Sequence, residues 1–200
     1  EKSSEVIVEG ESIGIKTAMQ LYAEEDRNYL RSCIQKAYNR LAKQYDPIVI
    51  EGAGSISEMN LLKQDLVNMS MARYANASVL LVADIDRGGV FASCYGSIML
   101  QSPHDRERIK GIIINKFRGD TRLFDEGRKM MESYCGVPVL GVIPYFDDIV
   151  IEEEDTLHGD TPENELLNDR NFREKQYDLL ANHVRKYLDI DALKKLMKDE

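Results

Sequence analysis

Five short runs of apolar residues limit the fold of this chain more than any other feature of its sequence. The runs are continuous rather than alternating, and most of their residues are Val or Ile. That pattern is typical of strands covered on both faces, as in a parallel sheet between layers of helices. The predicted buried strands are residues 6–8, 48–50, 79–83, 111–114 and 137–143.

Between these runs, apolar residues recur at spacings of three and four, which predicts amphipathic helices. The predicted helical segments are 30–41, 62–72, a helix starting near Val90, and 123–134. The alternation of strand and helix predicts an α/β fold, a doubly wound and mostly parallel sheet flanked by helices.

The pattern changes at residue 152, where four consecutive acids precede a polar stretch with Gly159 and Pro162. Such a segment is typical of a linker or a surface loop. A last apolar stripe then predicts an amphipathic helix. We therefore expect a domain over 1–151, a linker or junction over 152–171 and a helical tail over 172–200.

Composition excludes several classes of function. The 26 Lys and Arg residues against 35 Asp and Glu leave a net charge of −9, which disfavours nucleic acid as a partner. No apolar run is long enough to cross a membrane. The three cysteines have no disulfide or zinc spacing, and neither do the three histidines, so we predict buried thiols, surface histidines and a cytoplasmic location.

Ligands of such sheets bind at the carboxyl ends of the strands, so the residues after each run are the candidates. The run 48–50 is followed by Glu51 and a Gly-Ala-Gly-Ser turn, with Glu58 close behind. A carboxylate at a strand end can hold Mg²⁺ while small residues leave room for phosphates. A Gly-rich turn with an exposed acid remains the alternative.

Two further strand ends are rich in polar groups. After 79–83 the chain reads Asp84-Ile85-Asp86-Arg87-Gly88-Gly89, which fits either a phosphate or carboxylate site or an ion pair that closes a turn. After 111–114 come Asn115 and Lys116, where an Asn amide can read a purine edge, although a solvated turn is the alternative.

Residues 10–17 resemble the Walker A pattern GxxxxGK[ST] only in part. Gly10, Lys16 and Thr17 stand at the required spacings, but Ile15 replaces the glycine before the lysine. That glycine lets backbone amides wrap the phosphate. We therefore reject a phosphate loop at this position.

Taken together, these segments resemble the cobyric acid synthase family. The matching segments are 45–55 with Glu-Gly-Ala-Gly-Ser, 65–69, 82–93 with Asp-Ile-Asp-Arg-Gly-Gly-Val, 114–120 with Asn-Lys-Phe-Arg-Gly-Asp, and 136–145. The resemblance covers about residues 5 to 157, and residues 172–191 resemble the extreme C-terminus of the same family.

The resemblance implies a P-loop NTPase-like domain, similar to dethiobiotin synthetase. It also implies ATP- and glutamine-dependent amidation of corrin side-chain carboxylates in cobalamin biosynthesis, from adenosylcobyrinic acid a,c-diamide to adenosylcobyric acid through acyl phosphates. ATP, Mg²⁺ and glutamine-derived ammonia are the implied cofactors and co-substrate, and the corrinoid is the implied substrate.

Site residues follow by position within the matching motifs. Glu51 resembles the Mg²⁺-binding acid, Glu58 the substrate-handling acid and Asn115 the adenine reader, with Lys116 beside it. The strand-end signature adds three residues: Asp84 is assigned to nucleotide binding, and Asp86 and Arg87 to catalysis.

Two parts of the family pattern have no counterpart among the matching segments: the N-terminal phosphate loop and the glutaminase domain. We therefore expect a partial synthetase domain without its phosphate loop, dependent on a glutaminase elsewhere and inactive alone. A non-catalytic corrinoid- or nucleotide-binding remnant, and another dethiobiotin synthetase-like or partition-ATPase-like protein, are the alternative functions.

Overall fold

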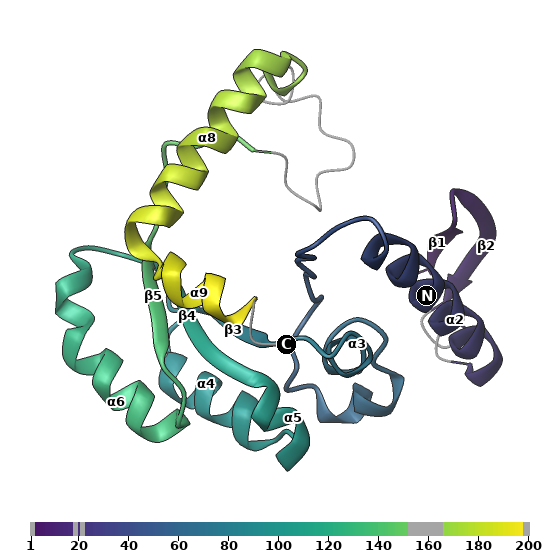
Figure 1. Cartoon of the computed structure of the whole chain (residues 1–200), viewed down its shortest axis with the longest axis horizontal. Helices are drawn as coiled ribbons and strands as arrows, with labels where there is room; N and C mark the ends of the chain where they lie inside the picture. The colour runs from purple at the N-terminus through teal and green to yellow at the C-terminus, as the bar shows by residue number, and fades with distance from the viewer. Residues whose placement is uncertain (1–2, 18–19, 21–22, 152–165, 198–200) are drawn as a thin grey trace. The chain divides into compact units, whose positions relative to one another are not determined.

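The computed structural model describes residues 3–17, 20, 23–151 and 166–197 (Figure 1). These residues fall into two compact units. The first unit comprises Glu1–Val79 and Met99–Arg108, and the second comprises Leu80–Ile98 and Ile109–Glu200.

The first unit begins with a two-stranded hairpin. Strands β1 (Ser3–Val8) and β2 (Glu11–Thr17) pair antiparallel, and Glu9 and Gly10 form the turn with φ of +55° and +87°. Two central residues with positive φ give a turn whose twist matches that of the strands. The prediction of a buried strand at 6–8 in the parallel sheet was therefore wrong, because Ile7 is 63% exposed. Strand β2 also occupies the rejected Walker A segment, in agreement with that rejection.

Helix α2 (Glu24–Ala42) covers the first predicted helix. It is held to α3 (Met69–Tyr74) by Tyr38, whose ring lies edge-on to Tyr74 at 5.9 Å, and by Asn39, whose amide donates to the Tyr74 hydroxyl at 2.8 Å. A short helix that the sequence did not predict, α5 (Pro103–Arg108), completes this unit. Asp105 of α5 accepts hydrogen bonds from Arg73 of α3 at 2.9 Å, so an ion pair ties the two helices together.

Two predicted elements of the first unit differ from the structure. The helix expected over 62–72 is divided into a 3₁₀ helix, η1 (Met59–Gln64), and α3. Asp65 lies at the break, and its carboxylate accepts from the backbone N–H groups of Val67, Asn68 and Ser70, the last of them in the first turn of α3. The strand expected at 48–50 does not form: these residues pair with none of the described strands, and Val49 is 85% exposed.

The second unit is built on a three-stranded parallel sheet of order β3-β4-β5, as predicted (Figure 1). The strands are β3 (Val79–Asp84), β4 (Ile109–Phe117) and β5 (Val139–Pro144). In the β4–β5 register, Ile112 pairs with Val139 and Phe117 with Pro144. The apolar runs of β4 and β5 are almost entirely buried, as predicted for strands covered on both faces. The same prediction was wrong for β3, which is mostly half-buried and whose Val82 is 59% exposed.

Helices α4 (Val90–Met99) and α6 (Asp125–Cys135), with the 3₁₀ turn η2 (Thr121–Phe124) before α6, supply the packing partners of this sheet. Their buried side chains form its core with the strands; they are Val90, Cys94, Ile98, Phe124, Met131 and Cys135. Helix α4 starts at Val90, as predicted, and α6 starts at Asp125, two residues after the predicted start, because a 3₁₀ turn precedes it. The α/β class of the fold is therefore confirmed.

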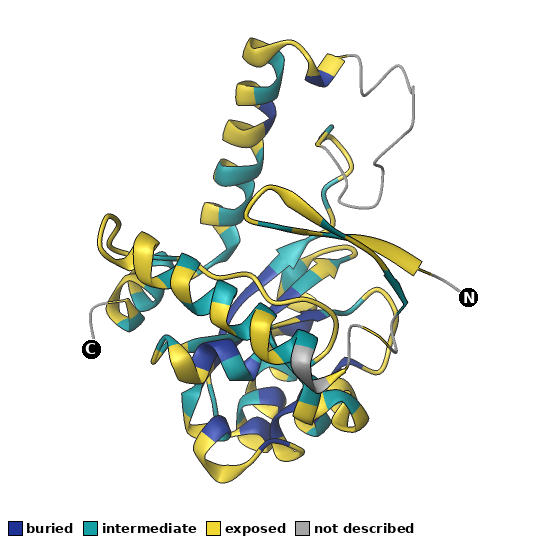
Figure 2. Cartoon of the chain, turned by 90° about the vertical axis from the view of Figure 1, so that its right-hand side faces the viewer, coloured by how far each residue is buried: buried dark blue, intermediate teal, exposed yellow. Residues whose placement is uncertain are grey.

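The tail forms two helices rather than one, α8 (Arg170–Tyr187) and α9 (Ile190–Leu196). The break lies at Leu188, which bridges Gly141 of β5, and at Asp189, whose side chain caps α9 through the N–H of Ala192 at 2.9 Å. Figure 2 shows α8 largely exposed or half-buried, while Gln176 is buried and accepts from the N–H of Val150 at 3.0 Å. The predicted linker falls mostly on residues 152–165, outside the described residues.

Candidate functional site

Two strand ends of the second unit bring most of the candidate residues together. Strand β3 ends at Asp84, and the backbone N–H of Ile85 donates to the carbonyl of Asn115 in β4 at 3.1 Å. Asp86, Arg87 and Lys116 follow directly at the same edge. This is the carboxyl edge of the sheet, where parallel sheets bind ligands.

Ion pairs organise this edge. The Lys116 ammonium lies 3.1 Å from Asp84 Oδ2, and Arg118 holds Asp86 with two hydrogen bonds, Nε to Oδ1 at 2.6 Å and Nη2 to Oδ2 at 3.2 Å. These cations lower the pKa of both carboxyls, and Asp86 raises the pKa of Arg118. Arg87 is 87% exposed, and its guanidinium makes a long contact of 3.7 Å with Asp84. The cation that binds Asp86 is therefore Arg118 and not Arg87.

Arg118 and Tyr145 form a flat surface that the sequence reasoning missed. The Arg118 guanidinium lies 3.9 Å from the centre of the Tyr145 ring, and the N–H of Tyr145 donates to the carbonyl of Phe117 at 2.8 Å. A small pocket of about 220 Å³ adjoins it, lined by Ile85, Asp86, Lys116, Phe117 and Arg118. The signal was present in the sequence, because Arg118 stands in the same Asn-Lys-Phe-Arg-Gly-Asp segment as Asn115.

Asn115 leaves one side of its amide available at this edge. Its Oδ1 accepts from the N–H of Lys116 at 2.9 Å, and Lys116 adopts a φ of +61°. Within the part of the chain that the structure describes, the Asn115 NH₂ group has no hydrogen-bond partner. A donor in this position can bond to a ring nitrogen of a base.

The other two candidates, Glu51 and Glu58, lie in the first unit. Glu51 is exposed and precedes Gly52, whose loop is fixed by Asn68. The Asn68 side chain accepts from the N–H of Ala53 at 3.1 Å and donates to the carbonyl of Ala53 at 2.8 Å. A methyl group on Gly52 would lie 2.3 Å from Asn68 Oδ1, so the loop can approach this amide only with glycine there.

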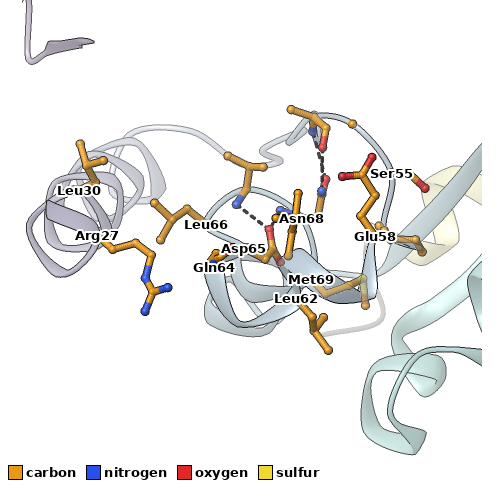
Figure 3. A pocket seen from close by; sticks show the side chains of 15 residues that line it. Arg27, Leu30, Ser55, Glu58, Leu62, Gln64, Asp65, Leu66, Asn68 and Met69 are labelled. Atoms are coloured by element: carbon orange, nitrogen blue, oxygen red, sulfur yellow. Dashed lines mark hydrogen bonds between the residues drawn. The ribbon is translucent and has the colours of Figure 1, made fainter. Parts of the chain in front are cut away.

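A larger pocket of about 300 Å³ opens beside this loop, wholly within the first unit (Figure 3). Apolar side chains make up much of its lining: Leu30, Ile56, Leu61, Leu62, Leu66, Val67 and Met69. Its charged members are Arg27 of α2, Glu58 at the start of η1, and Asp65, and Figure 3 shows Arg27 and Glu58 on opposite sides. A concave apolar site with a few polar groups is the usual form of a small-molecule site.

A magnesium ion has one clear candidate ligand, the exposed carboxylate of Glu51. Among the described residues, no three His, Cys, Asp or Glu side chains come together as a metal cluster. Mg²⁺ commonly takes only one or two protein carboxylates and completes its shell with water and substrate phosphates. The donor set therefore fits a Mg²⁺–nucleotide complex better than a permanently held ion.

The sulfur and imidazole groups lie away from this chemistry. Cys94 and Cys135 are buried and form no disulfide, as predicted, whereas Cys33 is only half-buried, which corrects the prediction for that thiol. Burial raises the pKa of Cys94 to about 11. His183 is no simple surface residue, which corrects the prediction: its ring stacks on Phe146 at 4.3 Å and lies 3.0 Å from the carbonyl of Pro144. It therefore packs α8 against the loop after β5.

Comparison with known proteins decides the family. The AAA domain family matches residues 14–153, well over half of the chain. This chain belongs to the AAA domain family. None of the described helices of the chain is long and apolar enough to cross a membrane.

The chain as a whole is similar to curated cobyric acid synthases. It is 61% identical to that of Phocaeicola vulgatus over 155 residues, which is 78% of this chain and 31% of the relative. It is 50% identical to that of Bacteroides fragilis over 198 residues, or 96% of this chain and 38% of the relative. The enzyme of Yersinia enterocolitica is 46% identical over 184 residues, or 89% and 35%. No solved structure matches the chain.

Two consequences follow from these matches. The resemblance to cobyric acid synthase is confirmed, and the chain spans about a third of the length of the relatives it matches. The match to the Bacteroides fragilis relative covers 96% of the chain and therefore includes most of the tail helices. These helices lie beyond residue 153, where the AAA match ends. The missing phosphate loop, the glutaminase elsewhere and the inactivity of the chain alone stay predictions.

Proposed function

We propose that this chain is the ATP-binding and carboxylate-activating part of a cobyric acid synthase, acting on a corrinoid. The observation that carries the proposal is the 46–61% identity to cobyric acid synthases over most of the chain. The carboxyl edge of the sheet and the pocket beside Glu58 supply the groups that nucleotide and corrinoid require. The chemistry is that of cobalamin biosynthesis.

The nucleotide is assigned to the carboxyl edge of the second unit. The Asn115 NH₂ group donates to a ring nitrogen of adenine, and the base stacks on the plane of Arg118. Asp84 holds Lys116 in place, and Lys116 and Arg87 lie where they can meet phosphate oxygens. Cations at this position offset the charge that spreads over the phosphates during transfer.

Glu51 is assigned to Mg²⁺. The ion neutralises charge on the β- and γ-phosphates when it is bound. The exposed carboxylate of Glu51 would supply one oxygen to it. Removal of Mg²⁺ should therefore weaken ATP binding to the chain.

The reaction proceeds by two displacements. A substrate carboxylate oxygen attacks the γ-phosphorus of ATP, so that the bond from the γ-phosphorus to the bridging oxygen breaks and ADP leaves with that electron pair. Ammonia, released from glutamine by a glutaminase, then attacks the acyl carbon, and phosphate leaves while a base takes the extra proton. Glu58 is the candidate for that base, because it lines the pocket and bonds to none of the described side chains.

Isothermal titration calorimetry of the whole chain tests this proposal. We expect saturable binding of Mg·ATP and of cobyrinic acid a,c-diamide. Asn115→Leu should weaken Mg·ATP about 10- to 100-fold, the value of one or two hydrogen bonds to a buried base. Asn28→Leu, an exposed asparagine on α2, is the matched control and should change neither affinity.

Two other results would lead elsewhere. Corrinoid binding that Mg·ATP leaves unaltered, with no measurable nucleotide binding, would favour a non-catalytic corrinoid carrier. Binding of Mg·ATP without any binding of the corrinoid would favour another dethiobiotin synthetase-like enzyme. Binding of neither ligand would refute the proposed function.

A further inference from the structure

Among the described residues, Arg27 has no partner for its charge, and it lines a pocket that is mostly apolar. It lies in the first turns of α2, half-buried, and lines the 300 Å³ pocket of the first unit. Its side chain forms no ion pair or hydrogen bond with the described residues, and its Nε–H is shielded from solvent without an acceptor. Burying a charged donor without an acceptor is unfavourable.

Two other arginines of the first unit have carboxylate partners, whereas Arg108, whose Nε is also buried without an acceptor, donates through Nη1 to Asn76 at 3.1 Å. Arg73 is bound to Asp105 at 2.9 Å, and Arg40, farther along the same helix as Arg27, lies 3.4 Å from Glu9. Two carboxylates, Glu58 and Asp65, line the same pocket, but neither forms an ion pair with Arg27. Asp65 is used by three backbone N–H groups, and Glu58 lies on the opposite side (Figure 3).

A second polar atom of the same pocket is also unsatisfied. Gln64 Oε1 is buried without a donor, and it forms no hydrogen bond with Arg27 Nε, although the two groups are complementary. The pocket therefore combines an unused charged donor, an unused acceptor and an apolar wall. Such a set matches a ligand with an apolar body that carries both a carboxylate and an amide.

We propose that Arg27 is a specificity residue that binds a carboxylate of the ligand, while Gln64 accepts from a side-chain amide of the same ligand. The inference rests on the proposed function, in which the substrate is a corrinoid bearing both free carboxylates and amides. Arg27 selects substrate that still has a carboxylate to amidate, and Glu58 lies across the pocket from it.

The first test is calorimetry on the whole chain with two corrinoids, cobyrinic acid a,c-diamide and cobinamide, whose side chains are all amides. We expect Arg27→Gln to weaken the diamide about 10- to 100-fold, since a charge-assisted bond is lost, and to leave cobinamide within about twofold. Arg27→Lys keeps the positive charge but loses the bidentate guanidinium, so its affinity for the diamide should lie between those of wild type and Arg27→Gln. Arg40→Gln is the matched control and should bind as wild type does.

The second test separates this inference from the proposed function. The Nε–Hε signal of Arg27 is assigned in a ¹H–¹⁵N spectrum by its loss in Arg27→Lys, and the chain is titrated with octanoate, octanamide, inorganic phosphate and the diamide. We expect octanoate and the diamide to shift this signal, and octanamide and phosphate to leave it unmoved. A shift with octanoate but not with the diamide would support the carboxylate site and count against the corrinoid.

Three results would overturn the inference. One is binding of the diamide with no movement of the Arg27 signal and no effect of Arg27→Gln, which would leave the proposed function intact. Another is an equal loss of diamide and cobinamide affinity in Arg27→Gln, since that is the effect of a merely structural residue. The third is a signal that moves as far with phosphate as with octanoate. Melting temperatures of all variants show whether each one is folded.

Discussion

Replacing Gly52 by alanine should uncouple the Glu51 loop from the amide that fixes it. The added methyl group would lie 2.3 Å from Asn68 Oδ1, far inside van der Waals contact. The Asn68 side chain must then leave, and its two hydrogen bonds with Ala53, at 3.1 and 2.8 Å, are lost. At about 0.5–1.5 kcal/mol for each neutral bond, Gly52→Ala should lower the free energy of unfolding by about 1–3 kcal/mol.

A double-mutant cycle turns this geometry into a sharper test. Asn68→Ala alone should cost about the same 1–3 kcal/mol, because it deletes the same two bonds. In Gly52→Ala combined with Asn68→Ala, the clash is absent and the bonds are already gone, so the two losses should not add. The interaction energy should therefore equal roughly one of the single losses.

Urea unfolding followed by circular dichroism measures these values, with Mg·ATP titrations as a functional readout. Gly96→Ala is the matched control: Gly96 lies within α4, a methyl group there has no neighbour within 4 Å, and alanine should stabilise the helix by about 0.5–1 kcal/mol. Additive losses at Gly52 and Asn68, or an unchanged urea midpoint in Gly52→Ala, would refute the reasoning.

Three further perturbations have defined outcomes. Asp105→Asn should lower the free energy of unfolding by about 1–3 kcal/mol, less than the loss of a fully buried ion pair, because Arg73 is 39% exposed. Burial alone would raise the pKa of Asp105, but hydrogen bonds from Arg73 and Ser102 lower it, so the stabilisation is present above the ordinary pKa of the carboxyl and is lost as the pH falls through its pKa in the folded state. Acid titration of wild type against Asp105→Asn measures this difference. Asp86→Asn should release Arg118 from its fixed position and weaken Mg·ATP several-fold in calorimetry while leaving corrinoid affinity unchanged, and an equal loss of both would contradict the assignment. Cys94 should react with Ellman's reagent at pH 8 only when the chain unfolds, since a pKa of about 11 leaves little thiolate, and immediate labelling of the native chain at this residue would contradict the buried site.

The sequence predicted β4 and β5 of the second unit well because their apolar runs are buried in the core of that unit. It failed for 48–50, where three apolar residues carry the same signal but have no strand partner in the described structure. It also failed for 6–8, where a turn at Glu9 and Gly10 turns the chain back on itself before any crossover helix can form. Short runs specify a tendency to extend, and the pairing depends on what lies beside them.

The sequence predicted those site residues that directly follow a strand, and it did not predict residues that reach the site from other parts of the fold. Asp84 and Asn115 come together because parallel neighbours end at one edge, which a sequence pattern can anticipate. Tyr145 is brought to Arg118 only by the register of β5, and the pairing of Asp86 with Arg118 rather than Arg87 depends on side-chain reach. Arg27 looked like any charge on an amphipathic helix, since nothing in its spacing shows that it lacks a partner.

The charges at the carboxyl edge indicate that Asp84 and Asp86 position the side chains of Lys116 and Arg118 and do not contact phosphate themselves. The three cations Arg87, Lys116 and Arg118 stand against Asp84 and Asp86, which leaves a local charge of +1 on a chain whose net charge is −9. An anionic nucleotide thus meets only a weak local attraction, and Mg²⁺ must supply most of the neutralisation. Removing either aspartate raises the local charge but frees a cation, so tighter nucleotide binding by Asp86→Asn would mean that net charge, and not the fixed position of Arg118, governs this edge.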